Sequence, residues 1–531
     1  MKRFRRRFVL VSMLSMLGVS VTQALAASAP DRIRIGLSSY TPINAAVWIA
    51  EDKGIFKKYG IDTEVVVLAG AAAGGVSALI AGDVQFLTAG GGAVINAGLN
   101  GADAVMIGSI VNKGVQRVMA RSDIRRPEDL RGKRVGVTRL GASSHMVLLL
   151  MLRQWGMNPN EVQTLQLNAS PAMMAALEKG AIDAAVLTEP TFFIAEDLGY
   201  RVLADLADMD IYYLHSMIDT TRAYLKTHRD LTTRFMKAYV EGIAYFKRYR
   251  AESVEVMKKK LRTAPAQVKY LERSHTLYAS GYFESAPYPA LKGVTSVLEF
   301  MAKDNPKART AEPRSFIDGS IVKEIEDSRI DPKHGMLIVV DMQNDFCHRD
   351  GAACKRGRDM GFVENMIPRL VNLVEQARAH HFPICFVRTS GNQWTNSPVW
   401  TEFKNPELLA CADGTWGAEF HEGLEPQPGE MIVTKHRYSA FIGTDLDMLL
   451  RARGVKSLLI TGVGTGMCVF HTLTVGFMLD YYITLVEDCC ATTYGPEAHN
   501  EAVALVKKHY GRVASANEIV NLWSKKLRQG G

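Results

Sequence analysis

The sequence predicts an α/β fold with parallel sheets, divided over more than one domain. Short apolar or alternating segments recur along the chain, and segments with helical periodicity separate them. Strand, helix and strand in this order are typical of parallel α/β units. A chain of 531 residues is also too long for one hydrophobic core, so we expect roughly two to four domains.

The first half contains two similar strand–helix units. We expect strands over residues 32–37 and 62–68, with a helix over 45–58 between them. The sequence ALIAGDV at 78–84 resembles ALEKGAID at 176–183, and each is a helix end that a glycine stops before a strand begins. This internal similarity predicts two lobes of similar construction.

Polar, glycine-rich segments follow the expected strands of this half. They lie at residues 38–40, 69–75, 88–92 and 138–144. In open α/β sheets, ligands bind beyond the carboxyl ends of the strands, where helix N-termini offer N–H groups. One such segment can equally be a simple turn, but four in one half favour a small-molecule site.

The first half carries four motifs in a fixed order, WIAEDKGIFKKYGID, ALIAGDVQF, EDLRGKRVGVT and ALEKGAIDAAVLTEP. With this set it resembles the periplasmic solute-binding proteins of the nitrate, sulfonate, taurine and thiamine-precursor group. The resemblance implies a two-lobed periplasmic-binding-protein fold (type 2) over residues 30–328. Such a domain closes on a small molecule and delivers it to an ABC permease in the inner membrane.

The same resemblance implies which residues line the cleft, namely Ser39, Tyr40, Gly91, Ser143, Ser144 and Glu189. The two serines at a helix start suit an oxyanion or a carbonyl group. Glu189 instead suits a ligand with N–H donors or a positive charge. Because these requirements differ, the sequence leaves the ligand open.

A linker at residues 329–335 leads into the second half, residues 336–531. With helices between them, we expect strands over residues 336–340, 384–388, 431–434 and 457–460. Asp341 and Lys435 directly follow two of these strands. A carboxylate at the end of a buried strand lies where α/β enzymes keep their chemistry, although Asp341 can also be a helix N-cap and Lys435 a surface charge.

The segment TGVGTGMCVFHT at residues 461–472 is the most distinctive one of the chain. Three glycines in five residues permit a tight turn, and Cys468 stands between this turn and an expected helix over 469–479. A thiol at a helix start lies beside backbone N–H groups that favour thiolate and can hold an oxyanion. A free cysteine is more often a buried structural residue, but the glycine turn favours a nucleophile.

The second half resembles the isochorismatase-like cysteine hydrolases in three frames, LIVVDMQNDF, VTKHRYSAFIGTDLDMLL and TGVGTGMCVFHT. The segment WGAEFHEGLEPQPGE brings it closest, within that superfamily, to the ureidoacrylate and biuret amidohydrolases. The resemblance implies a Rossmann-like α/β/α domain with a catalytic triad of Asp341, Lys435 and Cys468. It also implies an oxyanion hole at Gly464 and Cys468 and a cis peptide bond between Val463 and Gly464.

Hydrolysis of a C–N bond fits these residue types. Asp341 would take the thiol proton, Lys435 would stabilise the thiolate, and Cys468 would attack a carbonyl carbon. Isochorismate-cleaving members do not depend on a cysteine, so Cys468 disfavours vinyl-ether cleavage. Nicotinamidases of the superfamily carry a histidine-containing metal site, whereas residues 389–400 here contain no histidine, so we expect no metal and no cofactor. One departure is Gly466, where the family often has Asn or Asp.

The N-terminus predicts export. Residues 1–26 combine five basic residues, an apolar run over 8–21 and the small-x-small sequence Ala24-Leu25-Ala26, as a secretory signal peptide does. The run is shorter than the ~20 residues that a membrane-spanning helix needs. The same five charges account for much of the net charge of +8, so the composition gives no support to nucleic-acid binding. We therefore expect a periplasmic protein.

The cysteines favour a different compartment. All seven follow residue 340, and an odd number without regular spacing is poor support for a disulfide framework. Such a set is more typical of a cytosolic enzyme. A cytoplasmic protein with an uncleaved N-terminal segment therefore stays as an alternative.

The sequence as a whole predicts a fusion of a small-molecule-binding domain with a cysteine amidohydrolase that acts on an amide or ureide. Its expected partners are the small-molecule substrate, an ABC permease and, through the hydrolase domain, a second copy of the chain. Two alternatives stay open. One is a transport protein whose hydrolase is idle, and the other is an enzyme whose binding lobes serve as a sensor or scaffold.

Overall fold

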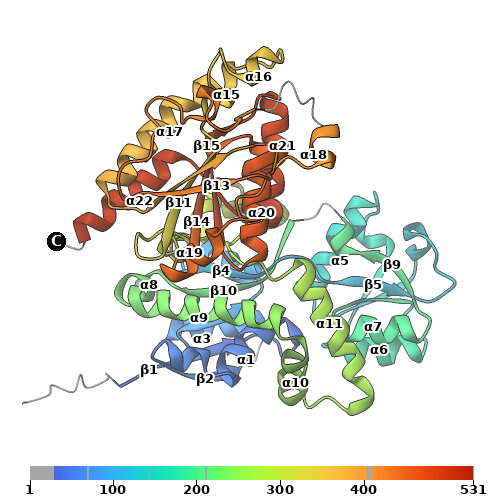
Figure 1. Ribbon diagram of the computed structural model, residues 1–531. Helices are drawn as coiled ribbons and strands as arrows, with labels where there is room; N and C mark the ends of the chain where they lie inside the picture. The colour runs from blue at the N-terminus through green and yellow to red at the C-terminus, as the bar shows by residue number, and fades with distance from the viewer. Residues whose placement is uncertain (1–28, 69–70, 142, 210–211, 404–409, 530–531) are drawn as a thin grey trace, which may run out of the picture. The chain divides into compact units, whose positions relative to one another are not determined.

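The computed structural model describes residues 29–68, 71–141, 143–209, 212–403 and 410–529 (Figure 1). The expected signal peptide, residues 1–26, lies outside the described residues. The chain forms two compact units. The first takes most of the chain up to Phe316, and the second takes Ile317–Gly531 together with Met106–Ser109 and Ala286–Ala290.

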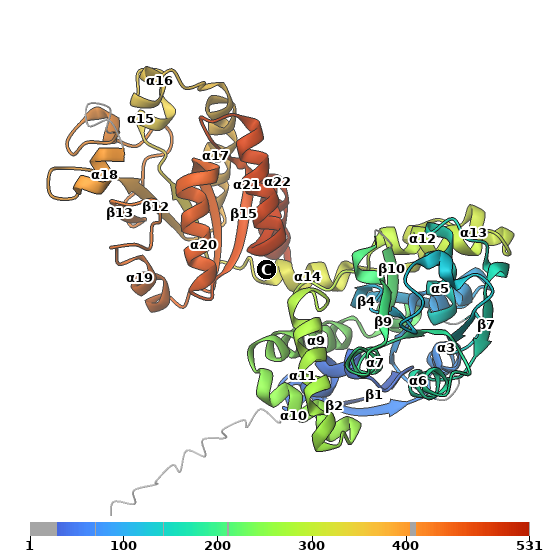
Figure 2. The ribbon, with the colours of Figure 1, turned by 90° about the vertical axis from the view of Figure 1, so that its right-hand side faces the viewer.

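Ten strands are described up to residue 221, and all belong to the first unit except that the middle of β4 is counted with the second: β1 (Asp31–Leu37), β2 (Ile61–Val67), β3 (Phe86–Ala89), β4 (Ala104–Lys113), β5 (Arg117–Ala120), β6 (Arg134–Val137), β7 (Gln163–Gln166), β8 (Ala184–Leu187), β9 (Arg201–Asp205) and β10 (Tyr212–Thr221). They form two five-stranded sheets, one in each lobe, and the lobes lie side by side in Figure 1 and overlap in the view of Figure 2. The first sheet has the order β2-β1-β3-β10-β4, and β10 runs antiparallel to β3. The second has the order β7-β6-β8-β5-β9, and β5 runs antiparallel to both neighbours.

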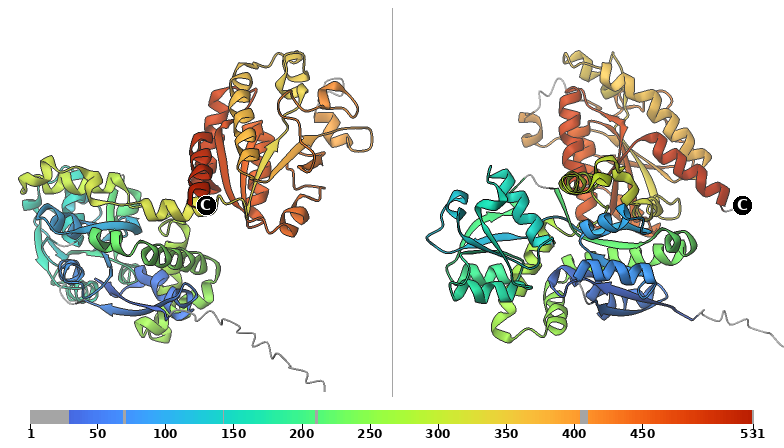
Figure 3. Two further views of the ribbon diagram at one scale, coloured as in Figure 1. Left: turned by 90° about the vertical axis from the view of Figure 1, so that its left-hand side faces the viewer. Right: turned by 180° about the vertical axis from the view of Figure 1, so that it is seen from behind.

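The α-helices described in this unit are α1 (Ala45–Asp52), α2 (Ile55–Lys58), α3 (Ala71–Ala81), α4 (Gly91–Leu99), α5 (Ser143–Gln154), α6 (Ser170–Glu178), α7 (Thr191–Asp197), α8 (Arg222–Thr227), α9 (Arg229–Arg248), α10 (Arg250–Leu261), α11 (Val268–Gly281), α12 (Leu291–Met301) and α13 (Pro306–Thr310). The longest, α9, buries Phe235, Tyr239 and Phe246, which recur at helical spacing, and packs against α1 (Figure 3). The helix expected over residues 45–58 is interrupted, because Gly54 adopts a φ of +67° between α1 and α2.

The second unit is built on a six-stranded sheet. Its strands are β11 (Gly335–Val340), β12 (Ile384–Thr389), β13 (Met431–Lys435), β14 (Ser457–Val463), β15 (Tyr482–Ala491) and β16 (Gly511–Ala514). They lie in the order β13-β12-β11-β14-β15-β16, and all neighbours are parallel. The four strands that the sequence predicted in this half are therefore present, and β11 is central.

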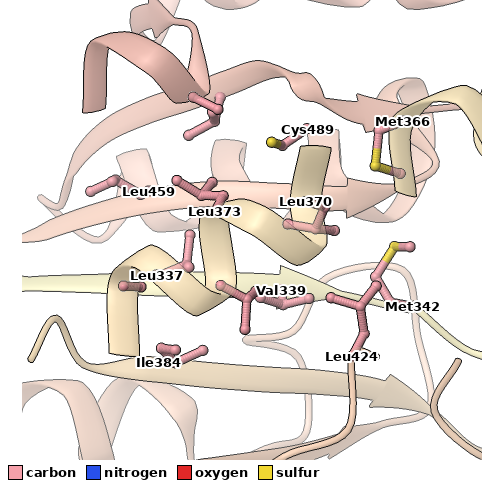
Figure 4. Packing of buried hydrophobic residues seen from close by; sticks show 14 of the residues in the cluster. Leu337, Val339, Met342, Met366, Leu370, Leu373, Ile384, Leu424, Leu459 and Cys489 are labelled. Carbon is pink, nitrogen blue, oxygen red and sulfur yellow. The ribbon is translucent and has the colours of Figure 1, made fainter. Parts of the chain in front are cut away.

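The α-helices described in the second unit are α14 (Ser320–Ser328), α15 (Asn344–Cys347), α16 (Ala352–Lys355), α17 (Gly361–Ala379), α18 (Pro398–Phe403), α19 (Leu446–Ala452), α20 (Phe470–Met478), α21 (Pro496–His509) and α22 (Ala516–Gln529). Alternate residues of β11 face opposite sides of the sheet. Leu337 and Val339 join one core cluster with residues of α17 and α22 (Figure 4), and Ile338 and Val340 join another with residues of α19 and α20. Helices on both faces leave β11 buried along its whole length.

In the described parts of the chain, no helix combines the length and the apolar character needed to cross a membrane. All seven cysteines lie within the described residues, and all are free thiols.

The turn after β14 depends on Gly462. Its φ is +110°, and a Cβ at this position would lie 2.1 Å from the carbonyl oxygen of Val340 on β11. Only glycine fits such a close approach of two backbones. The chain then enters α20 through a π-helical turn, η9 (Thr465–Val469), in which Gly466 has ordinary surroundings, since a Cβ there would meet nothing nearer than 3.9 Å.

We expect Gly462→Ala to destabilise the hydrolase unit and Gly466→Ala to be tolerated. A positive φ costs a non-glycine residue roughly 1–2 kcal/mol, and displacement of a packed strand adds roughly 1–3 kcal/mol. Urea unfolding of the full chain should show that Gly462→Ala lowers the free energy of unfolding by about 3 kcal/mol and that Gly466→Ala lowers it by less than about 1 kcal/mol. Equal stability of the two variants would contradict the role assigned to Gly462.

Candidate active site

Four neighbouring strands of the second unit each bring one polar residue to the same edge of the sheet. Lys435 is the last residue of β13 and Thr389 the last of β12, and the two are paired in register. Asp341 directly follows β11, and Cys468 lies in the turn η9 after β14. Because parallel strands end at a common edge, residues far apart in the sequence meet here.

Lys435 is at the centre of this group. Its Nζ lies 2.8 Å from Asp341 Oδ2, 2.6 Å from Thr389 Oγ1 and 3.4 Å from Cys468 Sγ. Thr389 Oγ1 in turn donates to Asp341 Oδ1 at 3.0 Å. The three hydrogens of the ammonium group therefore have three partners. The structure brings together the three residues that the sequence singled out, Asp341, Lys435 and Cys468.

The ion pair between Lys435 and Asp341 is removed from solvent, since each side chain is only 1% exposed. Burial alone would lower the pKa of Lys435, but the charge of Asp341 and the hydrogen bonds to Asp341 and Cys468 outweigh that effect and raise the pKa. Lys435 is therefore a permanent cation. Removal of one partner from a buried pair of this kind costs roughly 3–5 kcal/mol.

The Cys468 thiol is neutral in the resting site. Burial raises its pKa to about 12, the Asp341 carboxylate adds to the rise, and Lys435 opposes part of it. Burial and the Asp341 carboxylate therefore oppose the thiolate that the helix start was expected to favour. A thiol held this way loses its proton during the attack on a substrate and needs a base beside it.

Cys468, Lys435 and Asp341 line a cavity of about 810 Å³, a size that suits a small molecule. The peptide bond between Val463 and Gly464 is cis, as the resemblance implied, and Gly464 lines the same cavity. The remaining wall has aromatic and basic side chains, among them Trp400, Tyr438, Arg356, Arg358 and Arg437.

Thr389 is a member of the site that the sequence reasoning missed. The rule that points to Asp341 and Lys435, a polar residue at the carboxyl end of a buried strand, applies equally to Thr389. Its hydroxyl is the one group described here that bonds to both partners of the ion pair. Across the described residues, no three His, Cys, Asp or Glu side chains are grouped as metal ligands. The expected lack of a metal site stays a prediction.

The residues expected in the cleft of the first unit have varied surroundings. Ser39 and Tyr40 follow β1 and are exposed, and the Tyr40 hydroxyl donates to the carbonyl oxygen of Lys260 at 2.8 Å. Gly91 is buried at the first position of α4. Within the described residues, no side-chain hydrogen bond joins any two of the six expected ligand contacts.

The two serines at the start of α5 make different contacts. Ser143 Oγ accepts a hydrogen bond from Gln116 Nε2 at 2.9 Å, and Ser143 is also bonded to the Tyr213 hydroxyl. Ser144 Oγ instead accepts from the backbone N–H of Thr138 at 2.9 Å and lies 2.7 Å from Thr138 Oγ1. Ser144 therefore secures the loop after β6, whereas Ser143 belongs to a buried polar cluster that the sequence did not indicate.

Glu189 is a buried acid without a cation. Its Oε1 accepts a hydrogen bond from the Tyr278 hydroxyl, and its Oε2 has no partner among the described residues. Burial raises the pKa of Glu189 to about 7, and the bond from Tyr278 opposes only part of the rise. Near neutral pH this carboxyl group can therefore take or release a proton.

Two family models match the chain. The model described as isochorismatase domain matches residues 335–518, and the model described as NMT1/THI5 like matches residues 41–252. The ureidoacrylate amidohydrolase RutB of Stutzerimonas stutzeri is 35% identical over 200 residues, which are 34% of this chain and 79% of that protein. The chain belongs to the isochorismatase family.

Two solved structures resemble its halves. A cysteine hydrolase of Pseudomonas syringae pv. phaseolicola, 24% identical, covers 37% of this chain and 94% of its own, with a TM-score of 0.34. The periplasmic aliphatic sulphonate binding protein SsuA of Escherichia coli, 21% identical, covers 55% of this chain and 99% of its own, with a TM-score of 0.46.

The family membership confirms the enzyme class expected from the sequence, an isochorismatase-like amidohydrolase that acts on C–N bonds. The NMT1/THI5-like match confirms the resemblance of the first half to solute-binding proteins. The predicted fold class is confirmed as well, since a two-lobed unit of mixed sheets precedes a unit with a wholly parallel sheet in one chain.

We expect Glu189→Gln to stabilise the binding unit at high pH only. Below pH 4.5, Glu189 is protonated in the folded and unfolded states, so burial carries no ionisation penalty. The penalty grows as the pH rises towards 7, because the unfolded state ionises more easily, and it reaches roughly 3 kcal/mol above that pH. The glutamine keeps an oxygen for Tyr278 and never ionises.

Calorimetric unfolding of the full chain at pH 5 and pH 8 tests this expectation. The stability gain of Glu189→Gln over the wild type should be several times larger at pH 8. Glu178→Gln, at an exposed position, is the matched control and should show no such dependence. An equal effect of Glu189→Gln at both pH values would contradict the assignment of a titrating buried acid.

Proposed function

We propose that this protein is an exported fusion of a small-molecule-binding domain, residues 30–328, with a cysteine amidohydrolase, residues 336–531, joined by the linker at 329–335. The amidohydrolase hydrolyses a C–N bond of an amide or ureide through Asp341, Lys435 and Cys468. The observation that carries the proposal is the contact of one ammonium group, Lys435 Nζ, with both the carboxylate and the thiol. A nucleophile, a base and a fixed cation in one cavity are what acyl transfer by a thiol requires.

In the first step, Cys468 Sγ attacks the carbonyl carbon of the substrate while its proton passes to Asp341. An S–C bond forms, and the negative charge that leaves the carboxylate appears on the carbonyl oxygen. Lys435 keeps its proton and compensates the charge throughout. The backbone N–H groups of Gly464 and Cys468 are the proposed oxyanion hole, a device worth roughly 3–4 kcal/mol in other hydrolases.

In the second step, the C–N bond breaks and the proton on Asp341 passes to the leaving nitrogen, so that ammonia or an amine departs. A water molecule then attacks the acyl-enzyme, a thioester from an amide or a thiocarbamate from a ureide, and Asp341 again accepts a proton. Release of the carboxylic or carbamic acid regenerates the Cys468 thiol. Each turn consumes one water molecule for one C–N bond, and the triad ends in its starting protonation state.

Thr389 is the proposed positioning residue of this triad. Its hydroxyl accepts from Lys435 and donates to Asp341, so it holds the carboxylate in one orientation. A base fixed in this way does not need to reorganise when the thiol proton arrives.

The binding domain is proposed to take up a small molecule through Ser39, Tyr40, Gly91, Ser143, Ser144 and Glu189. A buried carboxyl group with an unpartnered oxygen supports a ligand that offers N–H donors, such as a ureide or an aminopyrimidine. An anion such as a sulfonate would meet an unneutralised acid there. Periplasmic location, delivery to an ABC permease and association through the hydrolase domain belong to the same proposal.

Cys468→Ala should abolish hydrolysis. Without the sulfur no covalent acyl-enzyme can form, so we expect ammonia release from ureidoacrylate to fall roughly 10⁴-fold or more in kcat. Cys354→Ala is the matched control, because this half-buried cysteine does not line the cavity, and it should retain activity. Wild-type turnover by folded Cys468→Ala would refute the mechanism. A wild type that hydrolyses no amide or ureide would favour the transport protein with an idle hydrolase.

The binding domain is tested by calorimetric titration of the full-length Cys468→Ala variant with a ureide, an aminopyrimidine and an alkanesulfonate. We expect binding of a compound with N–H donors. Glu189→Gln in the same background should weaken it about 10-fold or more, because a hydrogen bond to a charged group is lost. Glu178→Gln should leave the affinity unchanged. Binding of the sulfonate alone, unaffected by Glu189→Gln, would contradict the ligand class.

A further inference from the structure

The hydrolase cavity has a marked excess of positive charge. Four cationic side chains line it, Arg356, Arg358, Lys435 and Arg437, whereas Asp341 is the one carboxylate among the described lining residues. Asp341 is already paired with Lys435 at 2.8 Å. The three arginines have no ion-pair partner within the described residues.

A further acid beside the cavity, Asp413, does not change this balance. Asp413 lies outside the cavity lining and accepts hydrogen bonds from the side chains of Ser390 and Asn392, which do line it. Its carboxylate is therefore engaged by neutral groups, and the described structure shows no ion pair between it and the cavity arginines. The three cavity arginines are therefore available to pair with an anionic group of a bound molecule.

Arg437 is the arginine held in a defined place. Its Nη1 donates to the carbonyl oxygens of Thr395, at 3.0 Å, and of His436, at 2.7 Å. Its guanidinium carbon lies 5.3 Å from the centre of the Trp400 ring, and the side chain is half-buried. One nitrogen is thus used to fix the group, while Nε and Nη2 keep donors with no partner in the described structure. This is the pre-organised fork that suits a carboxylate.

Arg356 and Arg358 differ from Arg437 in exposure. Both lie in the segment between α16 and α17 and are exposed, and Arg358 stacks over the ring of Tyr494 at 4.1 Å. Exposed charges act over roughly a Debye length and are weakened by salt. They can draw an anion towards the cavity, whereas Arg437 is placed to hold it.

We propose that the substrate of this site carries a carboxylate or a similar anionic group, and that Arg437 binds that group away from the carbonyl carbon attacked by Cys468. The proposal rests on the proposed function for the location of the reacting carbonyl. The proposal distinguishes between the two kinds of substrate that the sequence analysis left open, ureidoacrylate and biuret. An anionic ureide such as ureidoacrylate fits the cavity, and neutral biuret leaves its arginines unpaired.

A pair of alkylating agents tests the proposal without turnover. N-iodoacetylglycine and N-iodoacetylglycinamide share one reactive carbon and one amide, and they differ only in a terminal carboxylate or carboxamide. Each forms one S–C bond with the thiol and releases iodide. The rate at Cys468 is followed in the full chain by mass spectrometry of its peptide, at pH 8.5 and low salt. The same two reagents are also allowed to react with glutathione, a free thiol, which gives the ratio of their intrinsic alkylation rates.

We expect the carboxylate reagent to be favoured at Cys468 by about 10-fold or more over the glutathione ratio, because a charge-assisted pair is gained. Arg437→Gln should remove most of that preference and leave the rate of the carboxamide reagent within about 2-fold. Arg437→Lys, which keeps the charge but not the fork, should retain part of it. Arg451→Gln, an exposed arginine paired with Asp447, is the control and should keep the full preference.

Several outcomes would overturn the proposal. An Arg437→Gln variant that slows both reagents equally would assign Arg437 a structural role, and one that slows neither would exclude it as the anion site. If that variant does not fold, the wild type decides, since a ratio equal to that of glutathione and insensitive to salt excludes an anion site. A clear carboxylate preference in a protein that hydrolyses no ureide would support the anion site and refute the proposed function alone.

Discussion

The buried ion pair between Lys435 and Asp341 is the interaction on which the hydrolase unit depends. An acid and a base with 1% exposure each are accommodated in the interior because they lie 2.8 Å apart. They come from β13 and from the end of β11, which flank β12, so the distance is maintained only while the three strands keep their register. Thr389, at the end of the strand between them, bonds to both charges. Stability and chemistry therefore share one constraint at this edge of the sheet.

The same ion pair accounts for the state of the nucleophile. Lys435 attracts negative charge towards Cys468 Sγ, but Asp341 opposes it and burial raises the pKa of the thiol further. The site thus stores a neutral thiol beside a base, which also protects the sulfur from reacting before a substrate arrives. Because the triad is close to electroneutral, the cations in the outer part of the cavity are not needed for its balance and act on the bound molecule.

The two units treat their buried acids in opposite ways. Asp341 is matched by a full positive charge, whereas the described residues give Glu189 hydrogen bonds but no cation, and its Oε2 stays unpaired. The first arrangement fixes a charge, and the second makes the charge depend on pH and on what is bound. A carboxyl group like Glu189 suits the reversible binding of a ligand with N–H donors. A carboxylate like Asp341, held beside a fixed cation, suits a reaction that moves protons repeatedly.

The sequence by itself determined the α/β class, four of the six strands of the hydrolase half and the positions of Asp341, Lys435 and Cys468, because strand ends and the glycine turn are local signals. It did not indicate β15, β16, α21 or α22. Thr389 obeyed the same local rule and could have been found. The tertiary structure alone decided that the Cys468 thiol is neutral, that Glu189 is buried and that Ser144 is bound to Thr138. It also decided which arginines line the same cavity as the thiol, since Arg356 and Arg437 come from different segments of the chain. Burial and the summed field of distant charges depend on packing between segments, which no local pattern in the sequence records.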